Sequence, residues 1–279
     1  MMSPLVLQGN GKILSMDSPL VMGIINVTND SFFPESRVTD ELSVLEKAAK
    51  MVADGAEILD IGAMSSRPGA KLSDPVLEAD IIKNTVKILR KSFPDIFLSV
   101  DTVWSNVAET AIEYGANMIN DISAGAIDPE VWKVAAYYDV PYVLMHMKGE
   151  PENMQNFADY DDVMLEMFGF FTKKIRQCKA AGIHQIIIDP GLGFSKTTQH
   201  NFTILKNFKT FTFFEKPIMA GLSRKSFISK TLGINVDEAL NGTTALHAHA
   251  LYSGANLLRV HDVKEAKQAV QLIEMLNKN

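Results

Sequence analysis

The chain has 279 residues, of which 47% are hydrophobic and 22% are charged, and 27 Lys and Arg against 33 Asp and Glu give it a formal net charge of −6. This composition is typical of a globular protein and excludes a disordered chain. The mild acidity argues against a general nucleic-acid binder, which usually presents a basic face. No apolar run reaches the roughly 18 residues of a transmembrane helix, and residues 1–20 lack the pattern of a signal peptide. We therefore expect a cytoplasmic protein with no nucleic-acid partner and no membrane partner.

Short apolar runs alternate with amphipathic segments along the chain. After residues 1–20, for which we predict a short hairpin or extension, eight runs are typical of parallel strands buried on both faces. They are Val21–Val27, Glu57–Ile61, Ile96–Val100, Asn117–Asn120, Pro141–Met145, Gln185–Ile188, Pro217–Ala220 and Asn256–Val260. Apolar residues spaced three and four apart predict a helix in most of the intervals. The predicted helices are Glu41–Ala53, Pro75–Lys91, Ser105–Tyr114, Pro129–Tyr138, Tyr160–Ala181, Thr197–Phe208, Val236–Gly254 and Val263–Leu276.

This alternation predicts an α/β protein with a (β/α)8 TIM barrel. The alternative is an open doubly wound sheet, whose first strand usually leads into a glycine-rich turn. Here the first strand leads into Asn26-Val27-Thr28-Asn29-Asp30. Because there is no linker, internal repeat or low-complexity run, we expect one domain over residues 1–279.

Polar side chains stand at the end of every predicted strand. In chain order they are Asn26; Asp60; Asp101; Asn120 and Asp121; His146; Asp189; Ser223, Arg224 and Lys225; and Arg259, His261 and Asp262. In a barrel of this kind the catalytic groups come from these strand ends and the loops after them. A polar mouth on an apolar barrel is the usual form of a small-molecule site.

One part of this mouth carries carboxylates and an amide. Asp101, Asn120 and Asp189 can pair with the adjacent N–H donors and acceptors of a heterocycle edge. Any single Asp could instead be a helix cap or turn former. We prefer that simpler interpretation for Asp60 and Asp121.

The other part is basic and follows the last two strands. Loops at this position in barrels often bind phosphate. Arg259 and His261 alternate along a strand end and can therefore point the same way. Arg224 and Lys225 could instead solvate a surface turn.

Two loops are long and each contains an arginine, residues 28–37 with the aromatic pair Phe32-Phe33 and residues 62–70 with Arg67. Such loops are typical of lids that close over a substrate and exclude water. The single cysteine, Cys178, excludes an intramolecular disulfide and a zinc site of several thiolates, and it lies inside a predicted helix, where we expect it to be inert.

Seven motifs resemble, in kind and order, those of the dihydropteroate synthases, which are pterin-binding barrels. They are Met22-Gly23-Ile24-Ile25-Asn26-Val27-Thr28 with Asp30-Ser31-Phe32; Asp60-Ile61-Gly62 with Ser65-Ser66-Arg67-Pro68-Gly69; Ser99-Val100-Asp101-Thr102; Ile119-Asn120-Asp121; Ile188-Asp189-Pro190-Gly191-Leu192-Gly193-Phe194; Ser223-Arg224-Lys225-Ser226; and Arg259-Val260-His261-Asp262. The resemblance covers the chain from about residue 5 to the C-terminus, and the last two motifs are the most diagnostic.

The resemblance implies an enzyme of folate biosynthesis that condenses 4-aminobenzoate with 6-hydroxymethyl-7,8-dihydropterin diphosphate, giving dihydropteroate and diphosphate. The family's pterin-pocket residues carry over to Asp101, Asn120, Asp189 and Lys225, with Ile122, Met145, Phe194 and Gly221 lining the ring. Its diphosphate ligands carry over to Asn26, Arg259 and His261, and Asn26 also holds Mg²⁺. Its aminobenzoate contacts carry over to Phe33, Ser66, Arg67, Pro68, Lys225 and Ser226. The resemblance also implies binding of sulfonamides and a homodimer formed through the late helices.

The implied chemistry fits the residue types at the strand ends. An arylamine is a weak nucleophile, so catalysis must act mainly on the leaving diphosphate, whose charge Mg²⁺, Arg259 and His261 can neutralise. The carboxylates of Asp101 and Asp189 favour a positive charge on the dihydropterin methylene. The predicted catalytic groups are therefore Asp101, Asp189, Lys225, Arg259 and His261, and no covalent nucleophile is required. We expect the lids to order only after pterin diphosphate binds.

Some positions depart from the family pattern. Asn29 stands where proline is common, Met64 where glutamate is frequent and Ser66 where threonine is usual, and residues 33–36 replace a glycine-containing stretch. These changes concern the lid contacts. Two alternatives stay open: a methyltetrahydrofolate-dependent methyltransferase, which needs no diphosphate clamp, and a pterin-binding paralogue without catalytic activity.

Overall fold

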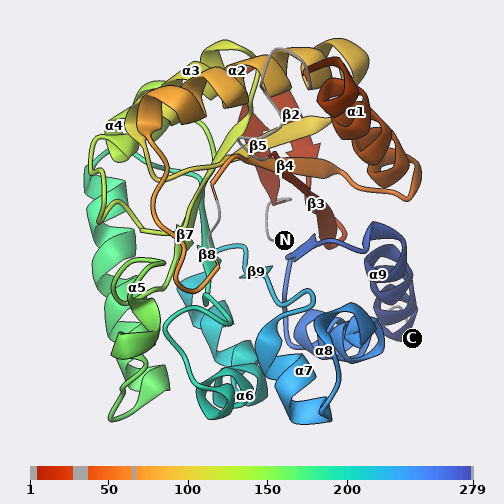
Figure 1. Cartoon of the computed structure of the whole chain (residues 1–279). Helices are drawn as coiled ribbons and strands as arrows, with labels where there is room; N and C mark the ends of the chain where they lie inside the picture. Colours follow the sequence, from red (N-terminus) through yellow and green to blue (C-terminus); the bar gives the residue numbers. More distant parts are fainter. Residues whose placement is uncertain (1–4, 28–36, 65–66, 278–279) are drawn as a thin grey trace.

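Eight parallel strands surround a common axis in the computed structural model, which describes residues 5–27, 37–64 and 67–277, with the side chains of residues 37–40 and 277 left out of the description (Figure 1). The strands are β3 (Leu20–Asn26), β4 (Ile58–Gly62), β5 (Phe97–Asp101), β6 (Met118–Asp121), β7 (Tyr142–Met145), β8 (Ile186–Asp189), β9 (Met219–Ala220) and β10 (Leu257–Val260). They hydrogen-bond in the order β8-β7-β6-β5-β4-β3-β10-β9. A single parallel bridge between Ile188 and Ile218 joins the two ends of this order. The predicted α/β barrel is confirmed, and its closure is weakest at the two-residue strand β9.

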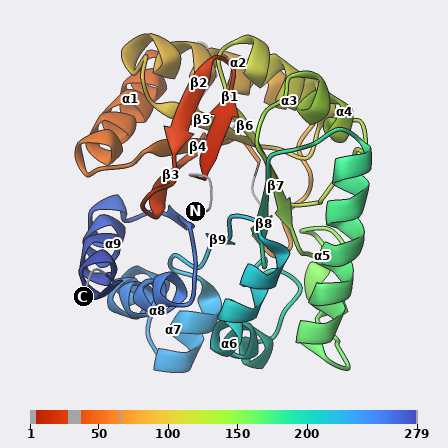
Figure 2. The same cartoon turned by 180° about the vertical axis from the view of Figure 1, so that it is seen from behind.

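Helices cover the outside of the barrel (Figures 1 and 2). They are α1 (Arg37–Ala53), α2 (Pro75–Ser92), α3 (Ser105–Glu113), α4 (Val131–Tyr137), α5 (Val163–Ala180), α6 (Thr198–Lys206), α7 (Ser226–Leu232), α8 (Leu240–Tyr252) and α9 (Val263–Asn277). Side-chain caps fix several starts: Asp74 accepts the N–H groups of Val76 and Leu77, and Asp162 accepts those of Met164 and Leu165. The cap at Asp162 explains why α5 starts after the predicted Tyr160.

Seven of the eight predicted strands agree with the structure to within one residue at either end. The prediction was wrong where short helical turns occur. Helix α7 was not expected, and neither was the 3-10 segment Phe208–Phe214. The long helix predicted from Val236 is a 3-10 turn, Val236–Glu238, followed by α8.

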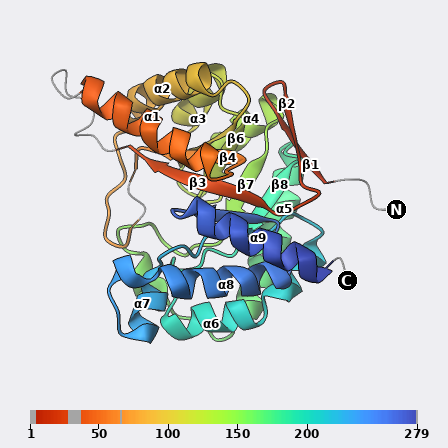
Figure 3. The ribbon, with the colours of Figure 1, turned by 90° about the vertical axis from the view of Figure 1, so that its right-hand side faces the viewer.

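An N-terminal hairpin closes one end of the barrel. Strands β1 (Val6–Gly9) and β2 (Lys12–Ser15) pair antiparallel and lie across the end from which β3 starts (Figures 2 and 3). Leu7 and Met16 join a buried cluster with one inward residue from the start of each barrel strand. Those residues are Met22, Ile58, Phe97, Met118, Val143, Ile187, Met219 and Leu257, with Leu20 beside them. This end is therefore a packed apolar floor, and a site must lie at the other end. The organisation as one domain stays a prediction.

Candidate functional site

On most of the barrel strands, the inward side chain two residues beyond the apolar floor is polar. Successive side chains of a strand point to opposite faces, so the residue two positions after each floor residue also points inward. On six strands this position holds Asp60, Asn120, Met145, Asp189, Gly221 and Arg259. The next inward positions include Asn26, Asp101 and His261. The alternation of the strands thus brings the heterocycle-type and the basic groups of the sequence analysis to one rim.

An ion-pair triad lies at the centre of this rim. The Arg259 guanidinium donates from Nε to Asp60 Oδ2 at 2.6 Å and from Nη2 to Asp101 Oδ2 at 2.5 Å. Asn120 Nδ2 also donates to Asp60 Oδ2, at 3.0 Å. The Asp60 carboxylate is completely buried, and the Arg259 side chain is 16% exposed. Burial opposes the charge on Arg259, but the two carboxylates outweigh this effect, so the pKa of the guanidinium is raised.

Asp101 is a carboxylate of the triad whose proton affinity is raised. Its burial raises the pKa, Arg259 lowers it, and the nearby Asp60 and Glu78 raise it further, so that the pKa of Asp101 is about 7. One oxygen of each carboxylate, Oδ1 of Asp60 and of Asp101, is buried without a hydrogen-bond partner among the described residues. Buried polar atoms are normally paired, so these oxygens are available to a ligand with N–H groups.

Asp189 lies on the opposite side of the rim. Its Oδ1 accepts the N–H of Gly191 at 2.8 Å. A Cβ on Gly221 would lie 3.6 Å from Asp189 Oδ2, so the missing side chain keeps the space before this carboxylate open. Burial raises the pKa of Asp189, and the hydrogen bond from Gly191 and the charge of Lys225 lower it. Asp189 can thus receive a second set of N–H donors.

An apolar surface lies between these polar groups. Ile122, Met145 and Phe194 belong to one buried cluster with Val103 and Met154. The Lys225 ammonium lies over the Phe194 ring, 4.0 Å from its centroid, which is a cation–π contact. Burial and the charge of Arg259 lower the pKa of Lys225 to about 8. A flat heterocycle could lie on this surface with its edge toward the carboxylates.

His261 and Asn26 extend the rim on the side of β10 and β3. Ser223 Oγ lies 3.1 Å from His261 Nδ1 and accepts the backbone N–H of His261 at 3.2 Å. Desolvation and the charge of Arg259 lower the pKa of His261 to about 4, so the imidazole is neutral near pH 7 and could meet an anion only as a hydrogen-bond donor. Asn26 is exposed at the end of β3.

Two strand-end residues, Asp60 and Arg224, have roles other than those expected, and a third, Asp121, has the expected one. Asp60 was interpreted as a cap or turn former, which is wrong, because it is the buried partner of Arg259 and Asn120. Arg224 is not part of an anion cluster, because it forms a two-point ion pair with Asp262, at 2.8 and 2.9 Å. The simpler interpretation holds for Asp121, which accepts the N–H groups of Ser123 and Gly125 and the hydroxyl of Tyr142.

The first predicted lid, residues 28–37, lies outside the described part of the chain except for Arg37, and residues 65 and 66 of the second lid lie outside it too. This applies to Asn29, Phe33 and Ser66. Arg67 and Pro68 are exposed in the second lid, and Ser226 is exposed as the first residue of α7. Their predicted contacts with aminobenzoate stay a prediction.

The residues the structure describes contain no cluster of three or more His, Cys, Asp or Glu side chains that could hold a metal by itself. Mg²⁺ prefers oxygen ligands and is often held by one or two protein groups together with substrate phosphates. The Asn26 amide oxygen suits that kind of site. None of the helices in the described ranges combines the length and apolar character that a membrane span requires.

Fold and rim together define an α/β-barrel enzyme whose site combines buried carboxylates, an apolar surface and a guanidinium. Residues 22–261 match the family described as pterin binding enzyme. The dihydropteroate synthase of Synechocystis sp. is 39% identical over 92% of this chain and 89% of its own length, and that of Escherichia coli K12 is 36% identical over 95% and 94%. The chain belongs to the pterin binding enzymes and, among them, to the dihydropteroate synthases, which are transferases.

Solved structures agree with this assignment. The Yersinia pestis dihydropteroate synthase in complex with a sulfonamide drug has a TM-score of 0.91 and 37% identity, covering 99% of this chain and 100% of that one. The Xanthomonas albilineans enzyme with 4-aminobenzoic acid has a TM-score of 0.91 and 35% identity over the same shares. These relatives are synthases, which favours that function over the methyltransferase alternative.

Proposed function

We propose that this chain condenses 4-aminobenzoate with 6-hydroxymethyl-7,8-dihydropterin diphosphate at the rim, releasing diphosphate. The observation that carries the proposal is the 2.5 Å contact between Arg259 Nη2 and Asp101 Oδ2. This contact joins the Arg259 guanidinium, which suits an anion, to the Asp101 carboxylate, which suits a heterocycle edge, and so supports a single site for both parts of the substrate. The Xanthomonas albilineans structure with 4-aminobenzoic acid supports the second substrate.

The pterin ring lies on the surface made by Ile122, Met145 and Phe194. Asp189 accepts N–H groups from one edge of the ring, and Gly221 leaves room for that edge. Asp101 and Asn120 face the other edge. Lys225 donates to the ring from above Phe194.

The diphosphate lies toward Arg259, His261 and Asn26. Arg259 Nη1 has no protein partner within the described ranges, so the guanidinium can bind a phosphate oxygen while Asp60 continues to hold Nε. His261 donates a hydrogen bond as a neutral ring. Asn26 and the phosphate oxygens would hold Mg²⁺, which neutralises negative charge on the diphosphate.

Bond breaking leads the reaction. The C–O bond between the pterin methylene and the diphosphate breaks, and its electron pair leaves with the diphosphate. The carboxylates of Asp101 and Asp189 stabilise the positive charge spread over the ring and its methylene. The arylamine nitrogen then forms the N–C bond and loses one proton to solvent. No enzyme nucleophile is needed, and burial raises the pKa of the Cys178 thiol to about 12, which leaves it unreactive.

Aminobenzoate enters last, between Lys225, Ser226 and the second lid with Arg67 and Pro68, and Phe33 and Ser66 complete this subsite. The sulfonamide complex of the Yersinia pestis enzyme supports binding of sulfonamides, and we propose this subsite for them. Tight binding of 4-aminobenzoate in calorimetry with neither pterin nor diphosphate present would contradict this order.

A homodimer through the late helices belongs to the proposal. Tyr252 of α8 and Leu272 and Leu276 of α9 are large apolar residues with high exposure. Such residues on neighbouring helices are typical of a covered surface. Sedimentation of the wild type and of Leu272→Lys tests it. A cytoplasmic location stays a prediction from the sequence.

The decisive assay follows diphosphate release. We expect release that requires both 4-aminobenzoate and pterin diphosphate, and a loss of at least 100-fold in Asp189→Ala and Lys225→Ala, on the order of one charge-assisted contact each. Release without aminobenzoate would contradict the proposed reaction. Full activity in both variants would contradict the residue assignment while leaving the reaction intact.

A further inference from the structure

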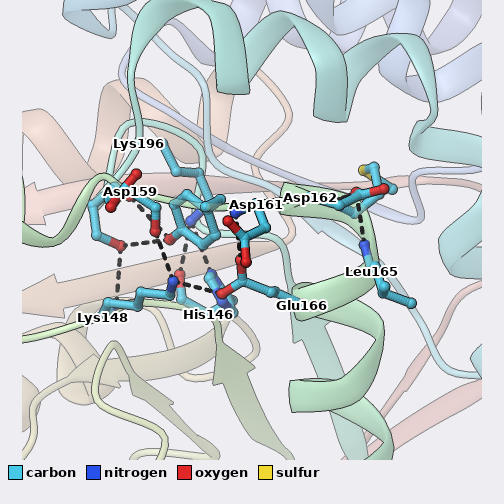
Figure 4. A network of polar contacts seen from close by, with 11 residues as sticks. His146, Lys148, Asp159, Asp161, Asp162, Leu165, Glu166 and Lys196 are labelled. Carbon is cyan, nitrogen blue, oxygen red and sulfur yellow. Dashed lines mark hydrogen bonds and ion pairs between the residues drawn. The ribbon is translucent and has the colours of Figure 1, made fainter.

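A buried lysine behind the rim has no part in the reaction described above. Lys196 follows β8 by seven residues and is only 4% exposed. Its Nζ donates to the carbonyl oxygens of Gly191 at 3.0 Å and Phe194 at 2.9 Å. It also donates to the carbonyl oxygen of His146 at 3.1 Å and lies 3.0 Å from His146 Nδ1 (Figure 4). No carboxylate forms an ion pair with it among the residues described here. A lysine buried without a carboxylate partner is rare and requires an explanation.

The three carbonyls belong to two loops that carry the rim. His146 directly follows β7, and Gly191 and Phe194 lie in the loop after β8. The two loops touch at Gly191, where a Cβ would lie 2.1 Å from the His146 carbonyl oxygen. Lys196 therefore bridges the two loops at the place where their backbones are closest.

The residues bound by Lys196 either belong to the pterin site or contact a residue of that site. The N–H of Gly191 holds Asp189 Oδ1, while the carbonyl of Gly191 is held by Lys196. Phe194, whose carbonyl is also held, carries the ring beneath the Lys225 ammonium. Displacement of this loop would therefore move the Asp189 carboxylate and the Phe194 ring together.

The charge state of the neighbouring imidazole is consistent with this arrangement. Burial and the charges of Lys196 and Lys148 keep the pKa of His146 well below its usual value, so the ring is neutral. A neutral ring can accept from the ammonium at Nδ1 and then carries its proton on Nε2. Burial lowers the pKa of Lys196 to about 7, and the four acceptors around its Nζ favour the protonated amine against that effect.

A second set of contacts holds the same segment from outside. Lys148 donates its backbone N–H to Ser195 Oγ and pairs through Nζ with Glu166 at 2.6 Å (Figure 4). Tyr160 donates to the carbonyl of Ser195 at 3.0 Å. The Lys148 side chain contacts neither Gly191 nor Phe194, so it offers a matched control in the same region.

We propose that Lys196 is a positioning residue for the pterin: its ammonium ties the loop after β8 to the end of β7 and so fixes the Asp189 carboxylate and the Phe194 ring at the separation that the pterin requires. This inference rests on the proposed function, because the pterin is the ligand whose binding it explains.

The test compares Lys196→Met with Lys148→Met, since methionine keeps most of the apolar stem and removes the ammonium. Calorimetry with pterin diphosphate and Mg²⁺ measures its Kd, steady-state kinetics measure the KM for 4-aminobenzoate, and thermal unfolding measures Tm. We expect Lys196→Met to raise the Kd about 10-fold or more, on the scale of a lost hydrogen bond to a charged group, and to leave the aminobenzoate KM within twofold. Lys148→Met should leave the Kd within twofold.

Other outcomes overturn the inference. An unchanged pterin Kd in folded Lys196→Met, or equal losses for both substrates, would show that Lys196 is not a positioning residue for the pterin. A wild-type protein that fails to bind pterin diphosphate would instead refute the proposed function itself. If Lys196→Met does not fold, Lys196→Ala with added propylammonium is used, and pterin binding should return with the amine and not with propanol. Failure of that variant to fold with the amine would also overturn the inference, because Lys196 would then be a folding residue.

Discussion

The most informative perturbation is the removal of the Asp60 charge. Asp60→Asn keeps the size of the side chain and one acceptor oxygen, but leaves Arg259 with a single carboxylate, Asp101. We expect the free energy of unfolding to fall and the KM for pterin diphosphate to rise, because Asp60 both neutralises Arg259 and fixes the direction of its guanidinium.

The magnitude follows from the geometry. Breaking a buried ion pair by removing one partner costs about 3–5 kcal/mol, and screening by solvent is weak here because Asp60 is 0% exposed and Arg259 only 16%. The Asn oxygen can still accept from Nε or from Asn120, and Arg259 keeps Asp101, so the loss should be smaller, about 2 kcal/mol. A guanidinium that is held less firmly should raise the KM for pterin diphosphate about 10-fold, equivalent to about 1.4 kcal/mol.

The control is Asp121→Asn on the neighbouring strand β6. Asp121 is equally buried, but it points away from the barrel interior and accepts hydrogen bonds from Ser123, Gly125 and Tyr142. Urea unfolding should show a comparable loss of stability in both variants, while diphosphate release should show a raised pterin KM only for Asp60→Asn. A KM within twofold of the wild type in destabilised Asp60→Asn would refute the argument that Asp60 orients Arg259.

Three further predictions follow from the same contacts. Because the pKa of Asp101 is raised to about 7, kcat/KM for pterin diphosphate should fall as the pH drops below 7, and the pH–rate profile of Asp101→Asn should not show this fall. The raised pKa also means that ionisation of Asp101 opposes folding. Urea unfolding should therefore show that the stabilising effect of Asp101→Asn grows between about pH 4 and 7. Gly191→Ala places a Cβ 2.1 Å from the His146 carbonyl oxygen at a φ of 66°, and should lower the free energy of unfolding by about 3 kcal/mol or more. The control is Gly11→Ala, where φ is 75° and no atom lies within 4 Å of the added Cβ, and where the loss should be about 1 kcal/mol. Chelation of Mg²⁺ should weaken binding of pterin diphosphate in calorimetry and leave Tm unchanged, because in the proposed site Asn26 would hold the ion only together with the substrate.

The barrel could be predicted from the sequence because its signal is local. A run such as Ile186-Ile187-Ile188 indicates a buried parallel strand wherever it lies, and the polar residue that follows it marks the strand's end. Short helical turns carry no such signal. Helix α7 is seven residues long, and its start at Ser226 has no side-chain cap, so neither periodicity nor capping indicated it.

The site could be predicted less completely, because its pairings are distant in sequence. Asp60 and Arg259 are separated by 199 residues and meet only through the register of β10 with β3 and of β3 with β4. An Asp at a strand end is compatible with a cap, a turn or a buried ion pair, and only the partner decides among them. The same applies to Arg224, which pairs with Asp262 and not with a bound anion, because this partner lies 38 residues away in the sequence.

In the proposed binding mode, the triad would couple binding of the pterin to binding of the diphosphate. Arg259 divides its N–H donors between Asp60 and Asp101. The raised pKa of Asp101 indicates that this sharing only partly compensates the cost of burying the negative charge of Asp101. A diphosphate competes with Asp101 for the guanidinium, whereas a pterin supplies N–H donors that Asp101 would otherwise lack. Either ligand alone leaves one buried charge poorly paired, but the two joined in one substrate satisfy both. We therefore expect pterin diphosphate to bind more favourably than the sum of its parts, and we expect this coupling to end when the C–O bond breaks, which would assist release of diphosphate.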